Sequence, residues 1–213
     1  MSYIKFATYS SVWFKNKYNL TNIKSQSVVR MKKSKQLAAE DWLKLALETL
    51  DNEGIHKVNV EYLARKLGVT KGSFYWHFKN RETLLKEMLN YWAETLTTDV
   101  IQRSRQSSKD AKETLLKLMT IITEEKVGRY EAAIRAWAMH DETAKADLHK
   151  VDEQRLKYIT SVFTDIGFKK ADAEIRARMM LYYQVAEQGI FLSDSKEKRK
   201  KLLKQRFTFL TRK

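Results

Sequence analysis

The stretch of sequence that decides the fold is residues 59–81, NVEYLARKLGVTKGSFYWHFKNR. Asn59 belongs to the residue types that cap the first turn of a helix, and the apolar positions after it recur at helical spacing. Gly68 then supplies the residue that most readily adopts the left-handed geometry found at helix ends. The first half of the stretch therefore predicts a short helix at 60–67.

The second half of the stretch predicts another short helix. Thr70 offers an N-cap hydroxyl, and Phe74 and Phe78 stand four residues apart, which places them on one face of a helix at 71–78. Two short helices joined by a four-residue turn are the layout of a helix-turn-helix. Phe74 and Phe78 are expected to pack against the preceding helices.

The remaining side chains of the second helix are unusual for a solvated surface. They are basic, polar and aromatic: Lys71, Ser73, Tyr75, Trp76, His77 and Lys79. Residues 65–81 hold five basic side chains and no acid, and exposed aromatic side chains usually serve binding. A nucleic-acid phosphate backbone satisfies both observations. A Trp76 buried against the first helix and a His77 without a role are the plainer alternatives.

Residues 39–81 resemble the N-terminal DNA-binding domain of the TetR family of bacterial regulators. The matching segments are WLKLAL at 42–47 leading to Gly54, VEYLARKLGVT at 60–70, KGSFYWHF at 71–78 and NRETLL at 80–85. Two further segments, IRAWA at 134–138 and ARMMLY at 177–182, are similar to parts of some C-terminal domains of the family. The resemblance implies a transcriptional regulator, expected to be a repressor that a small molecule releases from a palindromic operator.

The resemblance also implies which residues contact DNA: Asn59, Thr70, Lys71, Gly72, Ser73, Tyr75, Trp76, His77, Lys79 and Arg81. Tyr75 and Arg81 would meet phosphates, and Lys71 would face the major groove, where a Lys can recognise guanine. Gly72 would allow the backbone to approach DNA closely. The amino end of the helix after Asn80 would favour another phosphate.

The rest of the chain also predicts helices. With no Pro and only six Gly, the composition favours long helices. Apolar periodicity and capping residues place helices at 37–53, 80–105, 110–126, 129–140, 142–166, 170–192 and 195–211. With the two helices of the motif, the chain is expected to be all-α with about nine helices.

Three regions are expected. Residues 1–34 form a basic, poorly ordered arm, and Met31 followed by a lysine-rich run resembles a protein start. Residues 35–80 form the DNA-binding domain. Residues 81–213 form a helical domain for effector binding and dimerisation, with 81–105 as the connector.

The C-terminal helices suggest both an effector pocket and a dimer interface. Side chains that can line a pocket for a small apolar or aromatic effector are Met119, Tyr130, Trp137, His140, Phe163, Met180 and Tyr183, with a filled core as the alternative for each. The helices at 170–192 and 195–211 are expected to form the homodimer interface. Small residues, namely Ala173, Ala177, Ala186 and Gly189, would let two helices approach closely.

Composition narrows the classes of function. The chain has 213 residues and no Cys, which excludes disulfides and cysteine nucleophiles. Its formal net charge of +15 favours a polyanion or an anionic surface as partner, and charge alone does not choose between them. No apolar run approaches the roughly 20 residues that span a bilayer, so a cytoplasmic, nucleoid-associated protein is expected. Phosphate-loop, hydrolase and metal-binding patterns are absent, so neither an enzyme nor a cofactor or metal site is predicted. The rival hypotheses are a constitutive or architectural DNA binder using the basic residues 196–213 and the basic N-terminal arm, and an enzyme or lipid carrier using the helical cavity.

Overall fold

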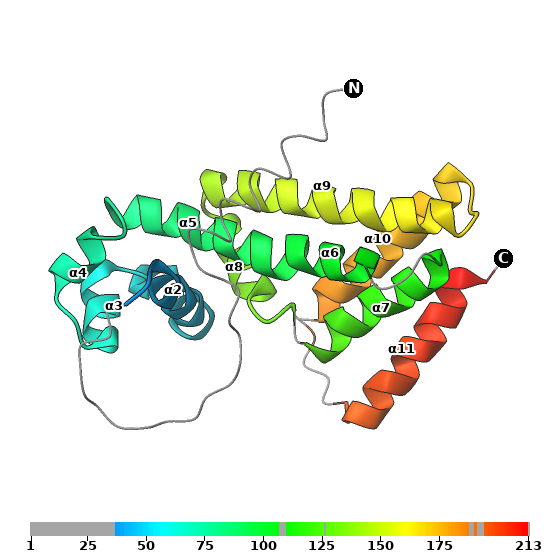
Figure 1. The fold of residues 1–213 in the computed structure, drawn as a ribbon, viewed down its shortest axis with the longest axis horizontal. Coiled ribbons are helices and arrows are strands. Elements are labelled where there is room, and N and C mark those ends of the chain that lie inside the picture. The colour runs from blue at the N-terminus through cyan, green and yellow to red at the C-terminus, as the bar shows by residue number, and fades with distance from the viewer. Residues whose placement is uncertain (1–36, 107–109, 126, 188–189, 191–193, 213) are drawn as a thin grey trace.

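The computed structural model describes residues 37–106, 110–125, 127–187, 190 and 194–212, and every regular element in this part is a helix (Figure 1). The predicted all-α class is confirmed. The predicted arm at 1–34 lies outside the described residues. Within them, no helix is both long and apolar enough to cross a membrane.

Each of the nine predicted helices has a counterpart among the described residues. In chain order the elements are α2 (Ala39–Glu53), η1 (Ile55–Lys57), α3 (Val60–Leu67), α4 (Lys71–Tyr75), α5 (Arg81–Ala93), η2 (Glu94–Thr98), α6 (Asp99–Gln106), α7 (Ala111–Glu124), α8 (Glu131–Ala138), α9 (Glu142–Asp165), α10 (Lys170–Glu187) and α11 (Lys196–Thr211).

Capping residues fix the ends of the short helices as predicted. The side-chain oxygen of Asn59 accepts a hydrogen bond from the Tyr62 N–H at 2.9 Å. Asn80 does the same for the Thr83 N–H at 2.8 Å. Gly68 ends α3 with φ 68°, a conformation that costs a residue with a Cβ more than it costs glycine. These local signals therefore place α3 and the start of α5.

The second helix of the motif begins at Lys71 as predicted, but it ends earlier and lacks the predicted side-chain cap. α4 ends at Tyr75, because the Phe74 carbonyl accepts from the N–H groups of both His77 and Phe78, so the last residues form a turn. The hydroxyl of Thr70 makes no capping hydrogen bond. The Ser73 N–H donates instead to the Thr70 backbone carbonyl at 3.1 Å, so the predicted side-chain cap is wrong.

The predicted connector helix at 80–105 is interrupted. α5 and α6 are joined by η2, a π-helical turn in which hydrogen bonds span five residues instead of four. The Thr95 hydroxyl donates to the Tyr91 carbonyl at 2.6 Å and so competes for an acceptor of the regular helix. The connector is therefore continuous along its axis but irregular in its middle.

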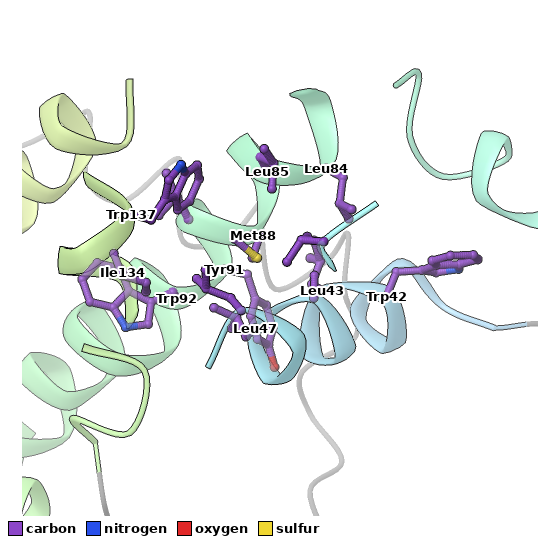
Figure 2. Close-up of a cluster of buried hydrophobic side chains, with 14 of the residues drawn as sticks. Trp42, Leu43, Leu47, Leu84, Leu85, Met88, Tyr91, Trp92, Ile134 and Trp137 are labelled. Atoms are coloured by element: carbon purple, nitrogen blue, oxygen red, sulfur yellow. The ribbon is translucent and has the colours of Figure 1, made fainter. Parts of the chain in front are cut away.

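The core of the amino-terminal head (residues 37–80) continues into the connector and α8. Figure 2 shows Trp42, Leu43 and Leu47 of α2 beside α5, with Ile134 and Trp137 of α8 in the same buried cluster. α2 packs on both α5 and α8. A shift of α5 or α8 therefore moves side chains that also pack against the helices of the head.

A second core joins α6, α7, α9, α10 and α11. Ala173 and Ala177 are fully buried in it, on the α10 helix that packs along α9. The expectation that these two alanines lie at a dimer interface is wrong, because their small side chains instead allow α9 and α10 of one chain to pack closely. Ala186 is exposed, and Gly189 lies outside the described residues.

Candidate functional site

The exposed face of α4 carries large aromatic side chains. Trp76 is 87% exposed and Tyr75 is 59% exposed, whereas Phe74 between the helices is buried. The Phe74 ring meets Trp42 edge-on, with centroids 5.4 Å apart, and Phe78 at 5.3 Å. The buried rings fix α4 on the head, and this leaves Tyr75 and Trp76 in solvent.

Acidic side chains lie closer to the basic run than the sequence suggests. Lys71 pairs with Glu61 of α3 at 2.6 Å, and a hydrogen bond from Lys71 holds the pKa of Glu61 below its usual value. Lys66 pairs with Glu53 at 2.6 Å. Hydrogen bonds from Lys66 and the Tyr62 hydroxyl lower the pKa of Glu53, and its carboxylate raises the pKa of Lys66. Residues 65–81 therefore contain no acidic residue themselves, but in the folded head Glu53 and Glu61 lie beside two of their lysines.

A cluster of cations around Tyr62 was missed by the sequence reasoning. The Tyr62 ring lies within cation–π distance of Lys66 at 4.9 Å, Arg65 at 5.2 Å and Lys57 at 5.7 Å. The spacing of Tyr62 to Arg65 and Lys66 is the i, i+3 and i, i+4 pattern of helix neighbours, which could have indicated the first two contacts. Lys57 comes from η1 and gave no such signal.

Arg81 has a structural partner in addition to its predicted role. Its Nε donates to the Val58 carbonyl at 2.6 Å, and its Nη2 donates to the Ile55 carbonyl at 2.9 Å. These bonds join the start of α5 to the segment between α2 and α3. Lys79, two residues earlier, is exposed and has no hydrogen-bond or ion-pair partner among the described residues.

Of the other predicted contacts, Gly72 and Ser73 lie on α4, His77 lies in the turn after it, and Asn59 lies at the start of α3. Gly72 is exposed, and a Cβ added there would meet Thr70 Oγ1 at 3.5 Å, an ordinary contact. Ser73 and His77 are partly buried. Asn59 is also partly buried, and its amide donates to the His56 carbonyl at 3.2 Å while its oxygen caps α3. The packing of the free protein therefore does not require Gly72, whereas it uses Asn59.

The C-terminal part holds an apolar pocket. Its enclosed space is about 60 Å³, well below the roughly 300–1,000 Å³ of typical small-molecule sites, so a ligand of ordinary size fits only after the walls move apart. The walls come from η2, α6, α7, α8, α9 and α10, and they include Val100, Ile101, Leu118, Ile159, Met180 and Leu181.

Two charged side chains, Glu131 and Arg155, line the same pocket. Arg155 Nη1 donates to both carboxylate oxygens of Glu131, at 3.0 and 2.9 Å, and its Nε donates to Thr97 Oγ1 at 2.9 Å. Arg135 donates to Glu131 at 2.6 Å and to both oxygens of Asp152, at 2.9 and 2.7 Å. Glu131 is only 3% exposed. Each of the four charges of this network, Glu131, Asp152, Arg135 and Arg155, has an opposite charge beside it, although the buried Nε of Arg135 has no hydrogen-bond partner.

The structure does not bring the seven predicted effector residues together. Met180 lines the pocket. The other six lie elsewhere. Met119 and Phe163 are buried in the second core, Trp137 belongs to the head core, and Tyr130 packs against the head core. His140 is exposed, and the Tyr183 ring lies beneath the Arg206 guanidinium. Gln184, which the sequence also offers as a lining residue, lies on the pocket wall with Met180. The polar lining residues Thr97, Glu131 and Arg155 were missed, because three separate helices supply them and no spacing links them.

Sequence comparison connects the head to known regulators. Residues 43–88 match the family described as bacterial regulatory proteins, tetR family. Class C tetracycline repressor of Escherichia coli is 28% identical over 166 residues, which cover 76% of this chain and 71% of that protein. The HTH-type transcriptional regulator AcrR of Shigella flexneri is 35% identical over 60 residues, or 27% of this chain and 28% of its own length.

Structural comparison extends the similarity beyond the head. A TetR-family transcriptional regulator from Rhodococcus sp. superposes with a TM-score of 0.66 at 20% identity, covering 84% of this chain and all of the other. Another from Streptomyces coelicolor gives a TM-score of 0.69 at 14% identity, covering 81% of this chain and 87% of the other. At these identities the likeness concerns the fold, and it includes the helices that enclose the pocket.

Proposed function

Because this chain belongs to the TetR family of bacterial transcriptional regulators, we propose that it is a repressor that binds a palindromic operator as a homodimer. A small molecule in the apolar pocket releases it. Residues 35–80 bind DNA, and residues 81–213 bind the effector and form the dimer, with 81–105 as the connector.

The exposure of Tyr75 at the end of α4 and of Trp76 directly after it is the observation that carries the DNA-binding surface. Large aromatic side chains left in water by a folded domain favour a partner, and Lys71 and Lys79 beside them favour a polyanion. In this arrangement α4 enters the major groove, where Lys71 exchanges Glu61 for a base edge. Tyr75, Lys79 and Arg81 then meet phosphates.

An apolar stripe on α10 supports the homodimer. Ile175, Met179 and Tyr182 are 57%, 47% and 58% exposed and recur at helical spacing, and Phe209 of α11 is 65% exposed. A two-fold interface pairs such a stripe with its own copy. Two heads then reach half-sites about 34–36 Å apart on one side of the duplex.

The position of the pocket supports coupling between effector and operator. Its lining includes Leu96 and Thr97 of η2 and Glu131 at the start of α8. Leu96 also packs against the head core, and α8 contributes Ile134 and Trp137 to that core. A ligand that prefers one arrangement of η2 and α8 therefore shifts the population of head positions, provided that its affinity differs between the two states.

Genome-wide binding followed by footprinting on the recovered sites tests the proposal. We expect protection of a palindrome that disappears in Lys71→Ala and Tyr75→Ala. The matched control is Lys157→Ala on the exposed face of α9. Uniform, salt-labile coating that survives both head substitutions but is lost when the basic residues of 196–213 are neutralised supports the architectural rival instead.

A further inference from the structure

The pocket combines an apolar wall with an electrically balanced polar corner. Glu131 accepts at both oxygens, and Arg155 Nη1 and Nε are both used in hydrogen bonds. Arg135 and Asp152 complete the network with one more charge of each sign. The four side chains thus carry no net charge, and the two that line the pocket are bonded to each other.

Such a corner offers no unpaired counter-charge to a ligand. A charged group that leaves water for an apolar site needs an opposite charge and hydrogen bonds to offset its lost hydration. A ligand carboxylate could reach Arg155 only at Nη2, which has no hydrogen-bond acceptor among the described residues but whose positive charge Glu131 already offsets, and a ligand ammonium would have to displace Arg155 from Glu131. Either ligand leaves the corner with one charge that is not balanced, which is unfavourable in a buried site.

We infer that the effector is an uncharged, predominantly apolar molecule, selected against anions and cations by the Glu131–Arg155 pair. This inference rests on the proposed function and specifies the ligand class for the same pocket. Gln184 is the neutral lining group that is able to accept or donate one hydrogen bond to such a ligand. The apolar wall supplies the affinity, and the paired charges supply the selectivity.

Two fluorescent probes with the same ring skeleton test the inference on the full chain. N-phenyl-1-naphthylamine is neutral, and 8-anilino-1-naphthalenesulfonate carries an added sulfonate. We expect saturable binding of the neutral probe at least about tenfold tighter than that of the anion, because the sulfonate lacks a partner in the pocket. We also expect 1-decanol to displace the neutral probe, but not decanoate or decyltrimethylammonium at equal concentration. Equal or tighter binding of either charged class overturns the inference.

Charge variants make the test specific to the network. Glu131→Gln keeps the shape but leaves two arginines against one acid, so decanoate should gain about tenfold in affinity. Arg155→Gln should produce the opposite change, in favour of decyltrimethylammonium. Glu174→Gln, which breaks the exposed pair with Arg178 on α10, is the control and should change neither.

A substitution at a more exposed member of the network keeps the test valid if Glu131→Gln does not fold. Asp152 does not line the pocket, and its side chain is 29% exposed, so Asp152→Asn should fold and should shift selectivity in the same direction as Glu131→Gln. Unchanged selectivity in a folded Asp152→Asn or Glu131→Gln variant overturns the inference. Operator release is measured separately. If the neutral probe binds but leaves the protein on DNA, the proposed effector role fails while the ligand class stands.

Discussion

At the scale of single residues, Gly72 separates DNA binding from folding. A methyl group added there meets one side-chain oxygen at ordinary contact distance, and alanine is about 1 kcal/mol better than glycine in a helix. We expect Gly72→Ala to leave the free energy of unfolding unchanged or raise it by up to about 1 kcal/mol. Operator affinity should fall about tenfold, because the methyl group occupies space that the DNA needs. Denaturant titration and fluorescence anisotropy measure the two quantities. Undiminished affinity would mean that the backbone at Gly72 stays away from the duplex.

Substitutions of Arg81 and Lys79 should both weaken DNA binding, but only the first should lower the stability of the fold. Replacing Arg81 by Met removes two hydrogen bonds to backbone carbonyls and should lower the free energy of unfolding by about 1–2 kcal/mol, in addition to weakening DNA binding. Lys79→Ala removes an exposed charge and should weaken DNA binding while leaving thermal unfolding unchanged. An Arg81→Met variant with an unchanged free energy of unfolding would show that the two hydrogen bonds to carbonyls do not stabilise the fold measurably.

At the scale of elements, the sequence predicts best what neighbouring residues decide. Asn59, Gly68 and Asn80 act within one turn of their own position, so α3 and the start of α5 follow from local chemistry. The prediction that the Thr70 hydroxyl caps α4 was wrong because the backbone carbonyl of Thr70 accepts the Ser73 N–H that the hydroxyl would have accepted. The pocket could not be predicted, since its walls come from helices far apart in sequence. Ala173 and Ala177 were correctly seen as close-approach positions, but the sequence does not say which helix approaches.

The α10 stripe yields a prediction about assembly. Ile175→Arg and Tyr182→Arg place charges in the apolar stripe and should convert the dimer to a monomer with little effect on the fold, because both side chains are exposed within one chain. Light scattering measures the mass, and circular dichroism checks the fold. Lys157→Ala on α9 is the control. A dimer that persists in both arginine variants would place the interface elsewhere.

At the scale of the whole molecule, operator binding should depend steeply on salt. If Lys71, Lys79, Arg81 and one of Arg65 or Lys66 each neutralise a phosphate in both subunits, about eight contacts give a slope of log K against log salt near −7. Arg81→Met should reduce its magnitude by about two, whereas Tyr75→Ala should weaken binding without changing the slope. DNA titrations at a series of salt concentrations measure this slope. A slope near zero would exclude this set of contacts.

The π-helical turn in the connector has a consequence for evolution by insertion and deletion. Removing one residue from an α-helix rotates everything after it by about 100° and usually ruins its packing. Here the buried positions Leu85, Leu89 and Trp92 are followed by Thr97, Val100 and Ser104, one step later than a regular repeat of three and four requires.

Deleting Thr95 would bring those later side chains into register with the earlier ones and turn the connector into one regular helix. We therefore expect this deletion, unlike a deletion at Lys86, to keep the fold and to match or exceed the parent's thermal midpoint by circular dichroism. A collapse of the midpoint would contradict this. On this prediction the extra residue is dispensable for folding, and what it contributes is the π-helical turn itself, placed where the pocket meets the head.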